Sequence, residues 1–123
     1  FVAAGFKPSS HAAAVLAAVR AGTLDFVWNE ATRGETEAVL RRIPPLREAA
    51  GVDLFRGTPP FQGPADVSAF DYVGDPGDRK FAALAVASGS TLVTNDDDLL
   101  SVRDRIPIPV LTPRELMDTV AVD

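Results

Sequence analysis

The chain has 123 residues, a formal net charge of −5 and no cysteine, which suits one domain with one core and excludes disulfides and thiolate metal sites. Its 17 acidic residues outnumber its 12 basic ones, which argues against binding nucleic acid through overall charge, because the phosphate backbone is itself negative. No apolar run approaches the roughly 20 residues of a membrane span, so we expect a single cytoplasmic domain over residues 1–123 without a membrane partner.

The first part of the chain alternates β-like and helical segments. Its opening "FVAAGF" is an apolar β-like run without a preceding turn or cap, and reads as the second half of a strand. The expected elements that follow are a helix over 8–22, a strand "LDFVW" over 24–28, a helix over 30–42 and a short helix over 45–51. Ser9 or Ser10 can cap the first helix, Gly22 can end it, and Asn29 can cap the second.

The second part of the chain begins with a change of composition. Residues 56–74 carry Gly, Pro and aromatics without a steady period, which indicates a long loop around at most one short irregular strand. The expected elements that follow are a helix over 75–89, a strand over 90–94, a helix over 97–105, a strand over 108–111 and a helix from 112. Asp75 is a good N-cap with Pro76 at the first helical position, and Thr112 and Glu115 can form a capping box. Strands alternating with helices predict a parallel sheet with helices on both faces.

Three acidic residues lie where the expected strands and helices would bring them together. In open parallel α/β sheets ligands gather at the carboxyl ends of strands, where "TNDDD" places Asp96. Asp78 lies near the N-terminus of the helix over 75–89, and Glu35 lies in the first turns of the helix that follows "LDFVW". Neighbouring carboxylates need a compensating cation, and Mg²⁺ or Mn²⁺ suits an all-oxygen site.

Each acid also has a plain structural explanation. Asp78 can serve only to stabilise a helix N-terminus, and Glu35 can be an ordinary surface glutamate. One aspartate of the run 96–98 can act only as a helix cap. His11, the one histidine, is expected to be solvated rather than a ligand. The residues alone leave these alternatives open.

Taken together, these segments resemble the PIN domain, a family of metal-dependent nucleases that includes ribonuclease toxins of bacterial toxin–antitoxin pairs. The most specific match is "DPGDRKFAALAVASGSTLVTNDDDLL", in which Asp78 is followed by a helix with Ala85, and the next strand ends in Thr-Asn-Asp. "IPVLTPREL" is similar to the family's closing strand and helix. The resemblance implies an α/β fold: a three-layer α/β/α sandwich around a mainly parallel sheet of four to five strands.

The resemblance also assigns site residues. It implies that the metal ligands and catalytic acids are Glu35, Asp78 and Asp96, with Asp98 as an auxiliary ligand and Thr94 and Asn95 shaping the turn. Asp97 matches nothing in the family pattern and is expected to face solvent. The family's first acid, in a motif like Asp-Thr-Asn, usually precedes a stretch such as "FVAAGF". We therefore expect the native protein to contain an aspartate before Phe1.

The function implied by the resemblance is a Mg²⁺- or Mn²⁺-dependent endoribonuclease with an antitoxin partner and a homodimeric assembly. Candidate phosphate contacts are Arg42, two helical turns after Glu35, and Arg79 and Lys80, beside Asp78. For Arg42, stabilising the helix C-terminus is the alternative. The rival interpretation of the whole chain is a PIN-like module that binds RNA or a protein partner without cleaving anything.

Overall fold

The computed structural model describes residues 1–7, 9–40 and 58–120. Within them the chain forms five α-helices and a three-stranded parallel sheet, which confirms the expected α/β class. The short helix expected over 45–51 and the candidate phosphate contact Arg42 lie outside the described residues. Among the described helices, none combines the length and the apolar character needed to cross a membrane.

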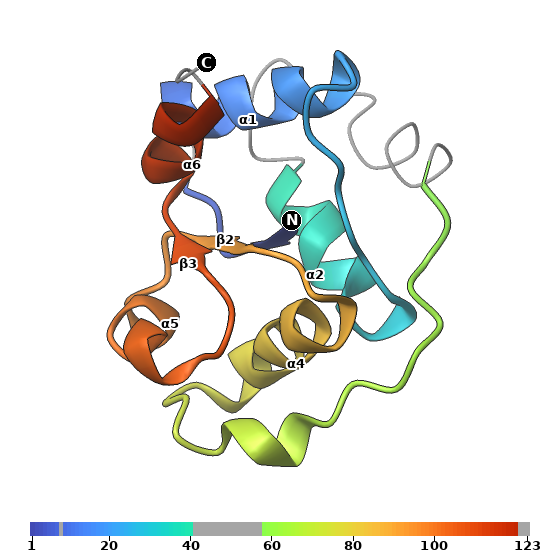
Figure 1. Cartoon of the computed structure of the whole chain (residues 1–123), viewed down its shortest axis with the longest axis vertical. Coiled ribbons are helices and arrows are strands. Elements are labelled where there is room, and N and C mark those ends of the chain that lie inside the picture. Colours follow the sequence, from blue (N-terminus) through green and yellow to red (C-terminus); the bar gives the residue numbers. More distant parts are fainter. Residues whose placement is uncertain (8, 41–57, 121–123) are drawn as a thin grey trace.

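The sheet joins segments that are far apart in the sequence. Its strands are β1 (Val2–Ala4), β2 (Leu92–Thr94) and β3 (Val110–Leu111), in the order β1-β2-β3, and both pairs are parallel (Figure 1). Ala4 lies opposite Thr94, so β1 and β2 end at the same edge.

The expected strand over 24–28 is reduced to a single bridge, in which Val27 pairs in parallel with Val2. The segment has little room to pair further. At its start, Leu24 N donates to the Ala18 carbonyl at the end of the preceding helix. At its other end, Asn29 already caps the next helix. Four to five strands are therefore not found in the described residues.

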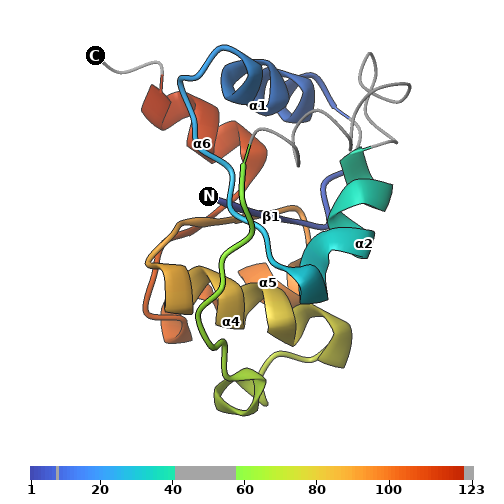
Figure 2. The same cartoon turned by 90° about the vertical axis from the view of Figure 1, so that its right-hand side faces the viewer.

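Helices lie on both sides of the sheet. In both views α1 (Ser10–Arg20) and α6 (Pro113–Val120) lie on one side and α4 (Arg79–Ser88) on the other (Figure 1 and Figure 2). Side chains alternate accordingly, because successive residues of a strand face opposite ways. Ala3 and Val93 belong to the apolar cluster that contains residues of α1 and α6. Val2, Ala4 and Leu92 belong to the cluster built around α4.

Local capping signals set the helix boundaries. Ser9 Oγ accepts a hydrogen bond from Ala12 N at 3.1 Å at the start of α1. Asn29 Oδ1 accepts one from Thr32 N at 3.0 Å at the start of α2 (Glu30–Leu40). These two predicted caps are confirmed. α2 packs against β1 and α4, which places it beside the carboxyl end of the sheet.

The predicted capping box before α6 is confirmed. Glu115 N donates to Thr112 Oγ1 at 3.1 Å, and Thr112 N donates to Glu115 Oε1 at 3.0 Å. The reciprocal pair satisfies two backbone donors that no helical carbonyl can reach.

Two elements of the second half differ from expectation. The helix expected over 97–105 is broken at Val102 into α5 (Asp97–Leu100) and the 3₁₀ turn η3 (Arg103–Arg105). The irregular strand expected within 56–74 is absent from residues 58–74, which instead contain the 3₁₀ turn η1 (Val67–Phe70). Asp66 caps that turn by accepting from Ser68 N, so local side-chain hydrogen bonding replaces strand pairing.

Candidate metal centre

The turn that follows β2 is held by two side chains. Asp96 N donates to Thr94 Oγ1 at 2.9 Å, and Lys7 N donates to Asn95 Oδ1 at 2.9 Å. The second bond ties this turn to the residues that follow β1. Thr94 and Asn95 thus shape the turn, in the manner expected, and they place Asp96 beside Gly5 at the edge of the sheet.

A pocket of about 230 Å³ lies at this edge. The acidic side chains that line it are Glu35 from α2, Asp78 from the start of α4, and Asp96 after β2. The structure therefore brings together the three acids that the sequence predicted to converge. Ala3 and Gly5 supply the wall on the side of β1, so among the described residues this strand adds no carboxylate to the pocket.

Asp96 lines the pocket rather than capping a helix. It occupies the N-cap position of α5, but its side chain makes no capping hydrogen bond. Its carboxylate instead packs against Gly5, where a Cβ would lie 2.7 Å from Asp96 Oδ2. Gly5 also has a φ of +60°, a conformation that disfavours other residues. Glycine at this position makes room for the acid.

Asp78 is a buried acid in an unfavourable electrical environment. It is 8% exposed, and its Oδ2 has no hydrogen-bond partner in the described part of the chain. Burial, followed by the charges of Asp96 and Asp75, raises the pKa of Asp78 to about 7. A side-chain hydrogen bond with Asp96 also raises it, and this bond forms only when the two carboxyl groups share a proton. Without that proton, Oδ2 is left unsatisfied.

The pKa of Asp96 is raised as well. Burial is the largest cause, and the charges of Asp98 and Asp75 act in the same direction. The hydrogen bond with Asp78 and the charge of Lys7 partly oppose this rise. A cation in the pocket would therefore stabilise the ionised form of both aspartates.

A second grouping of acids shares Asp78 with the pocket. Carboxylate oxygens of Asp75, Asp78 and Asp98 all lie within 4.8 Å of one another. The sequence interpretation missed Asp75, which it treated only as a helix cap. A signal was present: Asp75 begins the 3₁₀ turn η2 (Pro76–Asp78), and 3₁₀ geometry places residues three apart on the same side.

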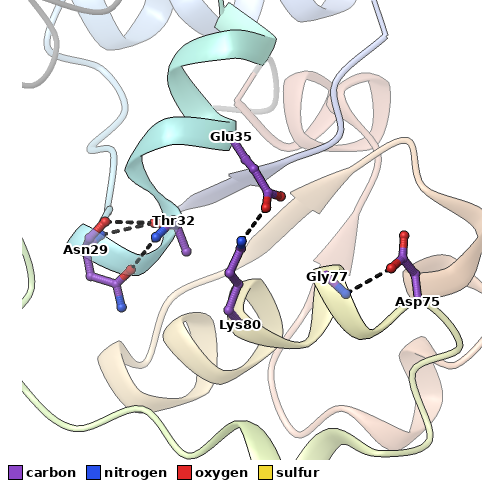
Figure 3. A network of polar contacts seen from close by, with 6 residues as sticks. All are labelled: Asn29, Thr32, Glu35, Asp75, Gly77 and Lys80. Carbon is purple, nitrogen blue, oxygen red and sulfur yellow. Dashed lines mark hydrogen bonds and ion pairs between the residues drawn. The ribbon is translucent and has the colours of Figure 1, made fainter.

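Glu35 is not free, because it forms an ion pair with Lys80 across the gap between α2 and α4 (Figure 3). Lys80 was predicted to contact phosphate, and in this structure its ammonium group pairs with Glu35. Figure 3 also shows Asp75 at the N-terminal end of α4, where its carboxylate accepts from Gly77 N at 2.9 Å.

Arg79, the other predicted phosphate contact that lies within the described residues, holds a loop. Its Nε donates to the Val73 carbonyl and its guanidinium to the Asp71 carbonyl, both at 3.0 Å. The side chain is therefore directed along the backbone of residues 71–73. A phosphate contact by Arg79 stays a prediction.

The remaining candidates do not line the acidic pocket. Asp97 and His11 are exposed, as expected. The loop aromatics Phe61, Phe70 and Tyr72 pack in the apolar cluster around α4.

A larger hollow of about 870 Å³ lies between α5 and α6. Charged residues of both signs line it, and Arg103 donates to Glu115 at 3.2 Å within it. This hollow lacks the concentration of one charge found at the end of the sheet. The acidic pocket is the better candidate for a catalytic site.

The acidic groups around Asp78 combine buried and exposed carboxylates with an unsatisfied oxygen. Oxygen ligands of this kind suit hard divalent cations. No protein-family model, curated protein or solved structure matches the chain. The functional argument therefore depends on the geometry of these residues and on the motifs in the sequence.

Proposed function

We propose that this chain is a PIN-like, metal-dependent ribonuclease that hydrolyses RNA phosphodiester bonds. The observation that carries the proposal is the pocket in which Glu35, Asp78 and Asp96 meet, although they come from three separate elements. The match of "DPGDRKFAALAVASGSTLVTNDDDLL" to the family pattern supports it, because two of the three acids lie in that stretch.

The acids fit a hard divalent cation such as Mg²⁺ or Mn²⁺. Asp78 Oδ2 needs a partner, and Asp96 and Glu35 offer further carboxylate oxygens at the same pocket. When bound, the ion supplies charge neutralisation and a water of lowered pKa. Asp78 must give up its proton to become a ligand, and Lys80 is placed to stay near Glu35 or to approach a phosphate.

The proposed fold is the PIN-like α/β/α sandwich. Its support is the position of α1 and α6 on one side of the sheet and of α4 on the other (Figure 2). The parallel bridge between Val27 and Val2 supports a fourth strand in the proposed fold.

RNA as the substrate, an antitoxin as the partner and a homodimer as the assembly rest on the family resemblance. The net charge of −5 makes local positive charge necessary for an anionic substrate. Lys7 and Lys80 lie close to the acids, since Lys7 lowers the pKa of Asp96 and Lys80 pairs with Glu35. Together with bound cations they can offset the repulsion.

Cleavage of a labelled RNA by the purified full-length protein with Mn²⁺ tests the proposal. Asp78→Asn and Asp96→Asn should each lower the cleavage rate by about 100-fold or more. Losing a residue that only supports a metal ligand typically costs about 10- to 100-fold, and losing a ligand itself should cost at least as much. Asp97→Asn removes the same charge from an exposed neighbour and should cleave normally. Equal rates for all of these variants, or RNA left intact by the unsubstituted protein, would contradict the proposal.

A second candidate function is binding without cleavage. It is favoured by the pairing of Glu35 with Lys80, which engages one acid of the pocket with a lysine instead of a metal ion. Calorimetric titration with Mn²⁺ separates the two candidates. A catalytic centre should bind the ion at millimolar or lower concentration, whereas a binding module that holds RNA or a protein without metal should give no heat.

A further inference from the structure

We infer that the ion pair between Lys80 and Glu35 is an internal gate, which withholds the Lys80 ammonium group from RNA phosphate until a cation takes the Glu35 carboxylate. The pair joins α2 to α4 beside the acidic pocket (Figure 3). While it is closed, each residue is occupied by the other: Glu35 takes the place of a phosphate and Lys80 takes the place of a metal ion. The inference deepens the proposed function and rests on it in so far as RNA is the substrate.

Glu35 is the partner that can leave. Its side chain is 53% exposed, against 27% for the side chain of Lys80. Exposed ion pairs contribute little to stability, so the carboxylate can turn toward a bound ion at little cost. Glu35 already lines the pocket together with Asp78 and Asp96. A divalent ion held there offers Glu35 a larger positive charge than a lysine does.

Lys80 is the partner that should stay in place. Its Nζ lies 5.8 Å from the centroid of the Phe81 ring, within the range at which an aromatic face attracts a cation. Phe81 is buried in the core and itself lines the pocket, so the position of the ring is fixed. Once Glu35 has left, the ammonium group therefore remains at the pocket, beside the place where a phosphate would contact the ion.

The charge of Lys80 matters because positive charge is scarce in this chain. A net charge of −5 repels an anionic polymer, which makes local cations necessary. Arg79, the neighbour of Lys80, donates instead to the carbonyls of Val73 and Asp71. Opening the pair would give the edge of the pocket a free positive charge only when an ion is present to compensate the acids.

Such a coupling must act in both directions. If an ion frees Lys80 for a phosphate, then a phosphate on Lys80 frees Glu35 for the ion, and the two affinities rise by the same factor. A partly exposed ion pair is worth at most a factor of about 5 in an equilibrium constant. Each effect of the gate should therefore be about 3- to 5-fold.

A cycle of single and double substitutions in EDTA tests the gate without any metal. Fluorescence anisotropy at low ionic strength measures the binding of a labelled single-stranded RNA to the full-length protein. Glu35→Gln should strengthen RNA binding by about 3- to 5-fold, because it frees Lys80, and should lose most of this effect when combined with Lys80→Met. Glu30→Gln is the matched control: it removes the same charge from an exposed position of α2, and its effect should not depend on Lys80. Both members of the pair are partly exposed, so these variants should remain folded.

Calorimetric titration with Mn²⁺ examines the other direction of the coupling. Lys80→Met should bind the ion about 3- to 5-fold more tightly than the unsubstituted protein, because no lysine then competes for Glu35. Lys7→Met is the control for charge alone. It removes a lysine whose charge also acts on the pocket, through Asp96, but it leaves the pair closed and should tighten Mn²⁺ binding less.

The outcomes separate this inference from the proposed function. If Glu35→Gln strengthens RNA binding equally with and without Lys80, the effect is a general loss of negative charge, and the inference is overturned while the proposed function stands. Equal Mn²⁺ affinities of Lys80→Met and the unsubstituted protein would overturn it as well. If no variant binds RNA in EDTA, freeing Lys80 gains no phosphate and the inference fails, whereas the cleavage assay with Mn²⁺ decides the proposed function separately.

Discussion

Asp78 links the two acidic groups, and its proton controls how the folded protein responds to pH. Its pKa is about 7 in the fold against an ordinary value of 3.8. Between pH 3.8 and about 7, Asp78 is therefore protonated in the native state and ionised in the unfolded state. The free energy of unfolding should fall as the pH rises from about 4 to about 7, by about 4 kcal/mol for this group, and change no further above that range.

Urea unfolding in EDTA at pH 5 and pH 8 measures this effect. The free energy of unfolding of the unsubstituted chain should be lower at pH 8 than at pH 5. Asp78→Asn should lose most of that difference, and at pH 8 its free energy of unfolding should be higher than that of the unsubstituted chain. Because an ion must displace the proton of Asp78, Mn²⁺ affinity should instead rise with pH up to about 7. An identical pH dependence of stability in Asp78→Asn would show that other groups are responsible.

Gly5 allows a second prediction at the scale of one residue. Gly5→Ala should destabilise the fold by about 1–2 kcal/mol, because alanine is strained at positive φ. It should also weaken Mn²⁺ binding at the pocket, since the new methyl group would displace the Asp96 carboxylate. Gly34→Ala is the matched control, because open space surrounds it in α2. That change should stabilise the helix by about 0.5–1 kcal/mol.

Thermal unfolding and Mn²⁺ titration of both glycine variants check the pair. A stable Gly5→Ala protein with unchanged metal binding would mean that Asp96 does not depend on the close approach of the backbone.

At the scale of elements, the capping box of α6 should contribute to stability without touching the site. Thr112→Ala removes the hydroxyl that accepts from Glu115 N and should cost about 1 kcal/mol. Mn²⁺ affinity should not change, because α6 packs against α1 and the sheet rather than the acids. Arg114→Ala, an exposed neighbour, serves as the control for urea unfolding. A loss of metal affinity in Thr112→Ala would refute this separation.

Helix ends could be predicted because their signals are local. Ser9, Asn29 and the Thr112–Glu115 pair each satisfy backbone donors within three residues, so the sequence contains the whole interaction. The extent of the strand over 24–28 could not be predicted from the sequence, because it depends on pairing with β1 and on the helices at both ends. The apolar pattern of "LDFVW" was correct for burial: Phe26 and Trp28 are in the core.

At the scale of the whole molecule, the convergence of the acids followed from a topological rule. Parallel strands end at one edge, which was enough to place Asp96 near the starts of two helices. The pairing of Glu35 with Lys80 could not be foreseen, because it depends on how α2 and α4 are rotated toward each other. Asp75 was missed because its role as a helix cap was taken as a full explanation, although the cap uses only one of its two carboxylate oxygens.

β1 pairs with β2 and makes one further bridge, between Val2 and Val27. A ribosome makes β1 at the start of this sequence and residues 92–94 only much later, at about 5–20 residues per second. Until β2 emerges, β1 has an unpaired edge that other chains or a chaperone can contact. Glu35 is likewise made long before Asp78 and Asp96. A nascent chain therefore carries no complete acidic pocket until Asp96 has been made.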